Sequence, residues 1–370
     1  MSAYYALLFI IPLVVWIGIT KTFLHMNINW KEVALQFGIT SVVIFLVFLA
    51  GIGSQTYDTK FVNGVITKLN PEKRSCDTYW SDFPDSFCTH QDTRRVRDGQ
   101  TCHTNSDGKR ICTPKYKTQY KSVYSWERRY FVTSSIDKYE IPRVDPQGVN
   151  APPRFSEIKI GDPVSGQVSY TNYIRGASSS LFNKHLSKEE LASVEYPVIY
   201  DFYKSDRVIT VDYTMSETTK AEWNEKLSVL NSNVIKTGAN VIVVVTSKSQ
   251  DFAENLAQSW DAHNINDVVV VIGMAGDNIS WVDVRSWSED SIVNVKLRDA
   301  IYSAKVLDID NINAYIEDVI LSDYKLQSMD AFEYLSNDIM PPTWAFVLAL
   351  IVLLIVTPVV TYYMNKYEIV

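Results

Sequence analysis

All four cysteines of this 370-residue chain fall within one short stretch, at Cys76, Cys88, Cys102 and Cys112. An even, clustered set of this kind is typical of disulfides formed in an oxidising compartment. Cys102 and Cys112 flank an Asp107-Gly108 pair, which favours a hairpin turn, so a bridge across that hairpin is the natural pairing. Cys76 with Cys88 would close a second small loop. The cysteines therefore predict two disulfides.

Two histidines near the cysteines, His90 and His103, raise zinc as the alternative. A zinc knuckle usually contains a CxxC pair, and none occurs in this chain. Adjacent Cys102 and His103 would also point to opposite faces of a strand. The disulfide interpretation is therefore preferred over the zinc site.

Sequence motifs for catalysis are missing. The chain has no GxSxG, HExxH, GK[ST] or EF-hand pattern. His263 closely follows Trp260, and it is better explained as a residue at a helix C-terminus than as a catalyst. The residue types alone therefore predict neither a reaction nor a cofactor.

Three charge-free apolar runs, residues 1–20, 33–57 and 343–364, predict transmembrane helices. Each is long enough as a helix to cross a hydrocarbon core of ~30 Å. A cleaved signal peptide is the alternative for the first run, but the opening MSAYY lacks a basic n-region. Because no span contains Asp, Glu, Lys or Arg, a pore or transporter would have no visible polar path unless oligomers form one.

Basic residues beside the spans and the cysteines together predict the orientation. Lys21 and Lys31 lie in the short loop 21–32, and Lys366 lies in the C-terminal tail. Short loops weigh more than long domains in the positive-inside rule. We therefore expect an integral plasma (inner) membrane protein whose loop and C-terminus are cytoplasmic. Its soluble region would be extracytoplasmic, in the periplasm.

Charge divides the soluble region into unlike parts. Residues 58–131 carry a net charge of +5, whereas residues 206–340 carry −12. The contrast predicts a domain boundary and two surfaces that could attract each other, between copies or within one chain.

Residues 58–205 are expected to form a β-rich domain with long loops. The segment 115–132 alternates aromatic with charged residues, for example Tyr116 and Tyr120 against Lys117 and Lys121. Such alternation is typical of a half-buried sheet, which is preferred over a nucleic-acid surface. Residues 140–190, rich in Pro and Gly, are expected to be loops or an extended arm.

Residues 206–340 show an α/β pattern. Ser216 could cap a helix whose apolar stripe is Trp223, Leu227, Leu230 and Val234, and Gly238 would end it. ANVIVVVTS and DVVVVIGMAG are apolar runs typical of strands buried on both faces, and NISWVDVRSW follows a tight turn. Helices are expected near 251–263, 290–304, 310–322 and 328–338.

In the order and the apolar pattern of its expected elements, the segment from Val211 to Asp338 resembles the TPM domain family. The shared features are the helix after VDYTMSETT, the ANVIVVVTS strand, the FAENLAQSW helix, the VVVVIGMAGDNISWVDV hairpin and the trailing helices. Members of that family are commonly extracytoplasmic and tethered by a transmembrane helix. The strand-rich part with its leading spans is similar to uncharacterised membrane proteins of large tailed bacteriophages.

The TPM resemblance implies a possible metal-dependent phosphatase-like activity. The acids that would correspond to the family's Ca²⁺ or Mg²⁺ ligands are Asp212, Asp277 and Asp283. Phosphate-ester chemistry also wants a positive cradle or an activated nucleophile, and this acidic segment shows neither.

Taken together, the sequence predicts an α+β membrane protein with three transmembrane helices, a β-rich disulfide-bearing domain and an α/β TPM-like domain. The preferred function is a non-enzymatic, membrane-tethered interaction and assembly protein. Its expected partners are the lipid bilayer, copies of itself and possibly another envelope protein, but no nucleic acid. The alternative is the TPM-type hydrolase.

Overall fold

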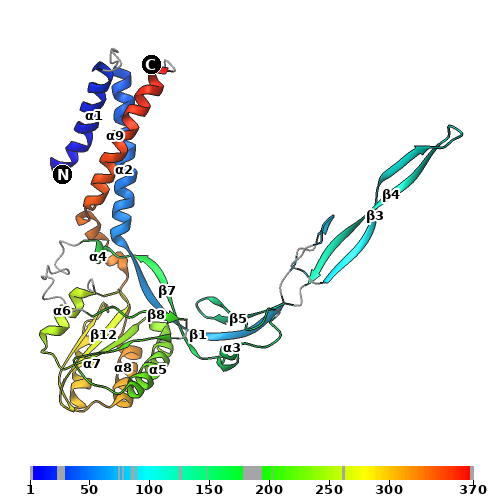
Figure 1. Cartoon of the computed structure of the whole chain (residues 1–370). Coiled ribbons are helices and arrows are strands. Elements are labelled where there is room, and N and C mark those ends of the chain that lie inside the picture. The colour runs from blue at the N-terminus through cyan, green and yellow to red at the C-terminus, as the bar shows by residue number, and fades with distance from the viewer. Residues whose placement is uncertain are drawn as a thin grey trace.

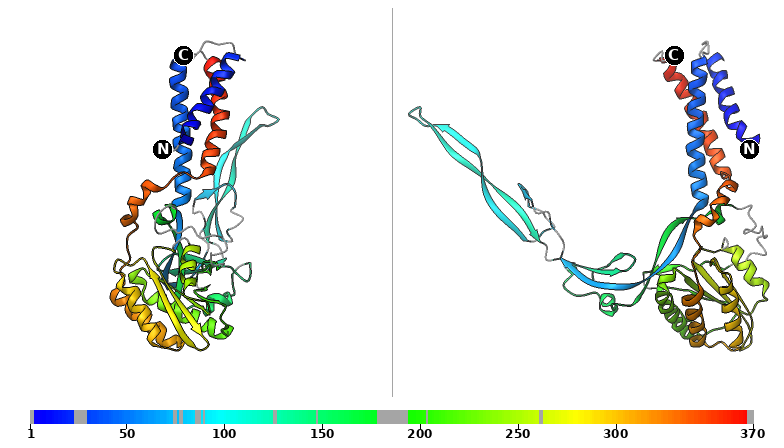
Figure 2. Two further views of the ribbon diagram at one scale, coloured as in Figure 1. Left: turned by 90° about the vertical axis from the view of Figure 1, so that its left-hand side faces the viewer. Right: turned by 180° about the vertical axis from the view of Figure 1, so that it is seen from behind.

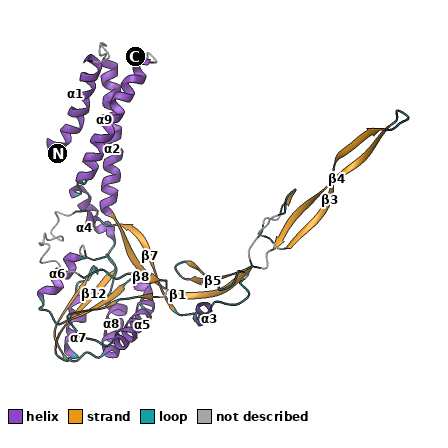
Figure 3. Ribbon diagram, viewed as in Figure 1, coloured by secondary structure: helices purple, strands orange, loops and turns teal. Residues whose placement is uncertain are grey.

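The computed structural model describes residues 3–22, 30–73, 76, 79–84, 88, 90–124, 127–146, 148–177, 194–202, 204–260 and 263–366. Three parts are distinct in Figure 1: a bundle of helices, a soluble body that contains two sheets, and a long hairpin that projects from the body. Figure 3 separates them by secondary structure, since strands dominate the projection and helices the opposite end. The α+β class is confirmed.

The bundle consists of α1 (Ala3–Thr22), α2 (Trp30–Thr56) and α9 (Thr343–Lys366). By length and composition, α2 and the Thr343–Met364 part of α9 could each cross a membrane. The apolar part of α1 that is described, Ile10–Thr22, is shorter, so the first span stays a prediction. Apolar contacts of Leu8, Ile44, Ala349 and Leu353 hold the bundle together.

One polar contact also joins two helices of the bundle. The Gln36 amide Nε2 donates to Thr361 Oγ1 at 3.1 Å and to the Thr357 carbonyl at 3.3 Å. Side-chain hydrogen bonds of this kind help helices associate where water is excluded. They therefore fix the register of α2 against α9.

The first sheet has the antiparallel order β6-β5-β1-β7. Its strands are β1 (Tyr57–Lys73), β5 (Arg128–Ser134), β6 (Lys138–Ile141) and β7 (Pro163–Thr171). Strand β1 follows α2 without a loop, pairing first with β7 and then with β5. The paired β1 and β7 beside the bundle are called the ribbon below.

Loops or an extended arm were expected over residues 140–190, of which 178–190 lie outside the described residues. Loops do occupy much of 142–162, but three short elements interrupt the stretch up to residue 177. They are α3 (Pro153–Glu157), β7 and α4 (Tyr173–Gly176). Pro and Gly lie at the boundaries of these elements: Pro153 is the first residue of α3, and Gly161, at φ +95°, forms a turn just before β7. Ile66, Tyr130, Val132 and Ile141 are among the residues that form the core of this sheet.

The projecting hairpin is formed by β3 (His90–Thr104) and β4 (Arg110–Tyr124), with β2 (Trp80–Ser81) beside β4. Residues 90–124 are called the arm below. The expected half-buried sheet over residues 115–132 holds only for its last part: β4 ends at Tyr124, and Tyr130 and Val132 are buried in β5, which belongs to a different sheet. Tyr116 is 53% exposed. Alternating aromatic and charged residues fit a free hairpin as well as a covered sheet.

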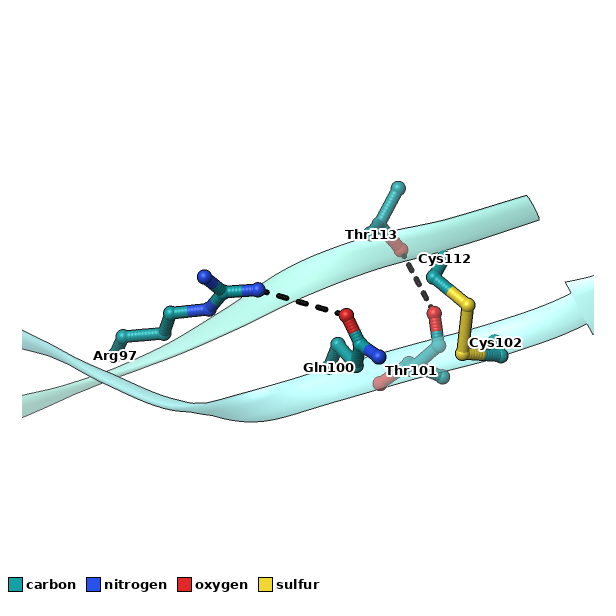
Figure 4. Close-up of a disulfide and its surroundings, with 6 residues drawn as sticks. All are labelled: Arg97, Gln100, Thr101, Cys102, Cys112 and Thr113. Atoms are coloured by element: carbon teal, nitrogen blue, oxygen red, sulfur yellow. Dashed lines mark hydrogen bonds between the residues drawn. A yellow bond between two sulfur atoms is a disulfide. The ribbon is translucent and has the colours of Figure 1, made fainter.

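Both predicted disulfides are present, Cys76–Cys88 and Cys102–Cys112. The second joins directly paired residues of β3 and β4 close to the tip of the arm (Figure 4). The turn beyond it closes through hydrogen bonds between Asn105 and Lys109, with Gly108 at φ +72°. The hairpin expected from Asp107-Gly108 is confirmed.

The second sheet has the order β10-β11-β12-β13, with the first three strands parallel and the last antiparallel. The strands are β10 (Val208–Val211), β11 (Asn240–Thr246), β12 (Asp267–Ala275) and β13 (Asn278–Ser286). One face packs against α5 (Glu217–Asn233), α7 (Ile292–Ser303) and α8 (Ile309–Asp323), and α6 (Asp251–Ser259) packs against the other. These elements form the α/β domain (Figure 2).

Local signals in the α/β domain were read correctly from the sequence. The Ser216 hydroxyl accepts a hydrogen bond from the Thr219 amide at the start of α5. The stripe from Trp223 to Val234 is buried, and Gly238 takes the left-handed conformation at φ +76°. The last expected helix, η2 (Met329–Asp338), is a 3₁₀ helix.

The soluble body meets the bundle through a small apolar cluster. Ile174 of α4, Ile265, and Phe332, Leu335 and Ile339 of the η2 segment are buried together. Ile52, near the end of α2, packs against them. The α/β domain is therefore held against the membrane end of the ribbon.

Candidate functional site

The three acids predicted as metal ligands lie apart. Asp212 follows β10 with φ +52°, and its carboxylate is 3.6 Å from the Lys248 ammonium. Asp277 lies in the turn between β12 and β13. Asp283 lies within β13 and accepts a hydrogen bond from Arg285 Nε at 2.8 Å. Each carboxylate therefore has its own surroundings.

Strand geometry shows why these acids do not converge. Asp283 pairs with Val271, five residues beyond the start of β13 at Asn278. At ~3.4 Å per residue, it lies ~17 Å along the strand from the turn that holds Asp277. Across the described ranges, no three His, Cys, Asp or Glu side chains are grouped so that they could hold a metal ion. The Ca²⁺ or Mg²⁺ site stays a prediction that this geometry does not support.

His263 is buried just beyond the C-terminal end of α6, with φ +54°. Its Nδ1 is 3.1 Å from the Asn264 carbonyl, and its ring lies beside that of Trp287. Burial lowers the pKa of His263 to about 4, so the ring is neutral at pH 7. A buried neutral ring at a helix end fits the structural role expected from the sequence.

A buried carboxylate that the sequence analysis missed lies four residues further on. Asp267 accepts hydrogen bonds from the Tyr196 hydroxyl at 2.8 Å, Asn240 Nδ2 at 2.8 Å and the Asn264 amide at 2.9 Å. Burial raises the pKa of Asp267 to about 6, against the lowering effect of these donors.

A second buried charged group, the guanidinium of Arg207, lies between the α/β domain and the ribbon. Arg207 is only 1% exposed, and its Nη2 donates to Asn63 Oδ1 at 2.5 Å and to Ser165 Oγ at 2.9 Å. Burial lowers the pKa of Arg207 to about 10, which leaves the side chain charged at pH 7. The ribbon residues Asn63 and Ser165 thus bind a cation from the α/β domain.

Further polar contacts tie the ribbon to the starts of the parallel strands. Asn266 Nδ2 donates to the Phe61 carbonyl at 2.8 Å, and Asn63 Nδ2 donates to the Ala239 carbonyl at 3.2 Å. The Tyr170 hydroxyl donates to Asn264 Oδ1 at 3.1 Å. Ligands of open α/β sheets bind at the carboxyl ends of the strands, whereas this network lies at the amino ends. We therefore interpret it as a joint between domain and ribbon, not as an active site.

An open groove lies between the first sheet and α5, with a volume of about 750 Å³. Its floor includes Ile66, Ile158 and Phe202, and Val229 of α5 lines one side. Three carboxylates also line it: Asp162, Asp206 and Glu225. Asp206 raises the pKa of neighbouring Tyr200 by its charge. Within the described part of the chain, no Lys or Arg forms an ion pair with Asp206 or Glu225.

The arm carries the opposite charge. Residues 90–124 have a net charge of +5, which equals that of the whole stretch 58–131. Lys117 is paired with Asp82 at 2.6 Å, and Arg94 stacks on Trp80 while donating to Gln119. Arg95 and Lys115 are exposed. Among the described residues, no ion pair joins the arm to the α/β domain.

Comparison of the chain with protein-family models, curated proteins and solved structures found no match. The TPM resemblance therefore remains an expectation from the sequence. The sequence signal for the joint was present but weak, since Asn240 and Asp267 are polar residues at the starts of two apolar runs. Their partners, Tyr196 and the ribbon, are distant in sequence.

Proposed function

We propose that this protein is a membrane-tethered, extracytoplasmic assembly protein that works as a homo-oligomer. The observation that carries the proposal is the arm. Its two strands of 15 residues each project from the body, and their side chains are mostly exposed. An isolated two-stranded hairpin is at best marginally stable in water, so a hairpin this long is best explained as a contact element for another molecule.

Two arguments favour a second copy as the molecule contacted. The net charge of +5 on the arm complements the −12 of residues 206–340. Tethering also gives all copies one orientation and a high local concentration, so weak lateral contacts become populated. Contacts between unlike patches on identical subunits are head-to-tail and can close into rings. Attraction within one chain is disfavoured, because no ion pair joins the described residues of the arm to the α/β domain.

The test is the mass of the full chain in mild detergent, measured by light scattering at low and high salt. The Debye length falls from ~10 Å at 0.1 M salt to ~3 Å at 1 M, so contacts between exposed charges weaken. We expect a multimer that shrinks as salt rises. A single-chain mass at both salt concentrations would refute the assembly.

A matched pair of variants ties that mass to the arm. Neutralising Arg95, Lys115 and Lys121 to Gln should lower the mass at 0.1 M salt. Neutralising Lys220, Lys236 and Lys325 to Gln removes the same charge from the α/β domain and should leave the multimer intact. Equal loss in both variants would contradict a specific role for the arm.

A further inference from the structure

The tip of the arm combines cations with an exposed apolar side chain. Ile111 is 40% exposed, although it lies only one residue from the disulfide of Cys112. Lys109 and Arg110 precede it and are exposed. The Cys102–Cys112 bridge holds this end of the hairpin although the tip touches no core. Because the bridge restricts the conformations of the tip, it preorganises the tip for contact.

The groove beside α5 has the complementary composition. Its floor is apolar, and Val229 on its side is 44% exposed. Two carboxylates line it, Glu225 on α5 and Asp206 just before β10, and neither forms an ion pair with a Lys or Arg that the structure describes. An apolar residue preceded by cations fits an apolar floor lined by carboxylates, because apolar side chains would meet and the charges are opposite.

The reach of the arm directs this contact to a second copy. Its 15-residue strands span ~50 Å at ~3.4 Å per residue. A domain the size of residues 206–340 is ~40 Å across. The arm leaves the body on the side away from the α/β domain (Figure 2). In Figures 1 and 2 the arm runs back to the height of the bundle, and because its charges exclude it from hydrocarbon, contact with a neighbour requires it to bend toward that neighbour's soluble body.

We propose that the arm tip of one copy, residues 109–111, docks in the groove between α5 and the first sheet of its neighbour. This inference rests on the proposed assembly function and names its contact. Ile111 packs on the apolar floor, and Lys109 and Arg110 face Asp206 and Glu225. Two arms do not pair with each other, because their like charges repel.

The first experiment replaces Ile111 with a photo-crosslinking phenylalanine analogue in the full chain, in membranes. Mass spectrometry should find the crosslink on α5 or on the segment around Phe202 of a second copy. The same analogue at Thr118, midway along β4, is the control and should not label the groove. Crosslinks to lipid would show that the arm tip binds the membrane and not the groove, which would overturn the proposal. Crosslinks to another region of a second copy would overturn the groove but keep the assembly.

The second experiment is a charge exchange. Glu225→Lys alone, and Lys109→Glu with Arg110→Glu alone, should each lower the yield of the intersubunit crosslink about three- to tenfold. The three substitutions combined should restore it. Glu225 is exposed, so the fold should survive its replacement. If the combined variant does not regain the crosslink although the multimer is still present, only the docking is refuted. If the unsubstituted chain is monomeric and forms no crosslinks, both proposals are refuted.

Discussion

Asp267 and His263 are buried near each other, and their pKa values move in opposite directions. For Asp267 the pKa rises from 3.8 to about 6, so its contribution to stability grows as pH falls through 6. For His263 the pKa falls from 6.5 to about 4, so the unfolded chain takes up the proton first and stability is lost below pH 6.5. The two contributions oppose each other between pH 4 and 6.5.

Single substitutions should separate these two effects. On going from pH 7 to pH 5, His263→Gln should gain stability relative to the unsubstituted chain, by on the order of 2 kcal/mol, because the opposing protonation is removed. Asp267→Asn should lose stability over the same interval, by on the order of 1 kcal/mol. Thermal unfolding at both pH values measures the difference. Parallel pH profiles for all three proteins would contradict the burial of these groups.

The disulfides permit a second test at the scale of single residues. Intact mass under non-reducing conditions should show four hydrogens fewer than the reduced chain, without zinc. Replacing Cys102 and Cys112 by Ser should destabilise the arm by about 2–3 kcal/mol, since the closed loop is short. Trypsin should then cut faster at Lys109 and Arg110, while the melting temperature of the α/β domain stays unchanged. A lower melting temperature there would mean that the arm packs on the domain.

At the scale of elements, Asn231 joins helix to strand inside the α/β domain. Its Oδ1 accepts the Val241 amide at 2.7 Å, and its Nδ2 donates to the Leu227 carbonyl at 2.9 Å. Asn63 of the ribbon donates to the same Oδ1 at 3.4 Å. One buried amide therefore sets the positions of α5, β11 and the ribbon relative to one another.

Asn231→Ala should lower the free energy of unfolding by about 1–3 kcal/mol, because it leaves the buried Val241 amide without an acceptor. Asn233→Ala, two residues along the same helix, removes an exposed hydrogen bond to Glu317 and should change the free energy of unfolding by less than about 0.5 kcal/mol. Denaturant unfolding of the two variants gives the comparison. Equal losses of stability in the two variants would show that the buried Asn231 amide does not stabilise the domain more than an exposed one.

At the scale of the whole molecule, the bundle constrains the topology. The C-terminal end of α9, the end of α1 and the start of α2 lie at the end of the bundle away from the soluble body (Figure 1). Two apolar helices and two disulfides indicate a membrane protein with a domain in an oxidising compartment.

Topology reporters test the orientation that the cysteines and short-loop charges favour. Fusions at residue 27 and after residue 370 should report cytoplasm, and a fusion at residue 150 should report the extracytoplasmic side. The physical reason is that structural disulfides persist only where thiols are not kept reduced. A cytoplasmic signal at residue 150 would reverse the orientation but leave the membrane anchoring intact.

Features with local signals could be predicted from the amino-acid sequence. Apolar run length marked α2 and α9, Asp107-Gly108 marked the hairpin turn, and Ser216 and Gly238 marked the ends of a helical segment. The cysteine pairing also followed from neighbouring positions. In each case the deciding interaction joins residues close in the chain, so a short window contains the necessary information.

Which segments cover each element could not be predicted in this way, because it depends on contacts between distant parts of the chain. Tyr116 has the alternation of a buried strand, yet it is 53% exposed, because among the described residues only the two-residue strand β2 pairs with the arm. In the sequence Asp267 is an ordinary acid at the start of a strand, and only the fold brings Tyr196 and Asn240 to its carboxylate. The groove likewise exists only because β1 and α5, more than 140 residues apart in sequence, meet in space. Burial and charge matching are set by long-range contacts, which a local sequence pattern does not encode.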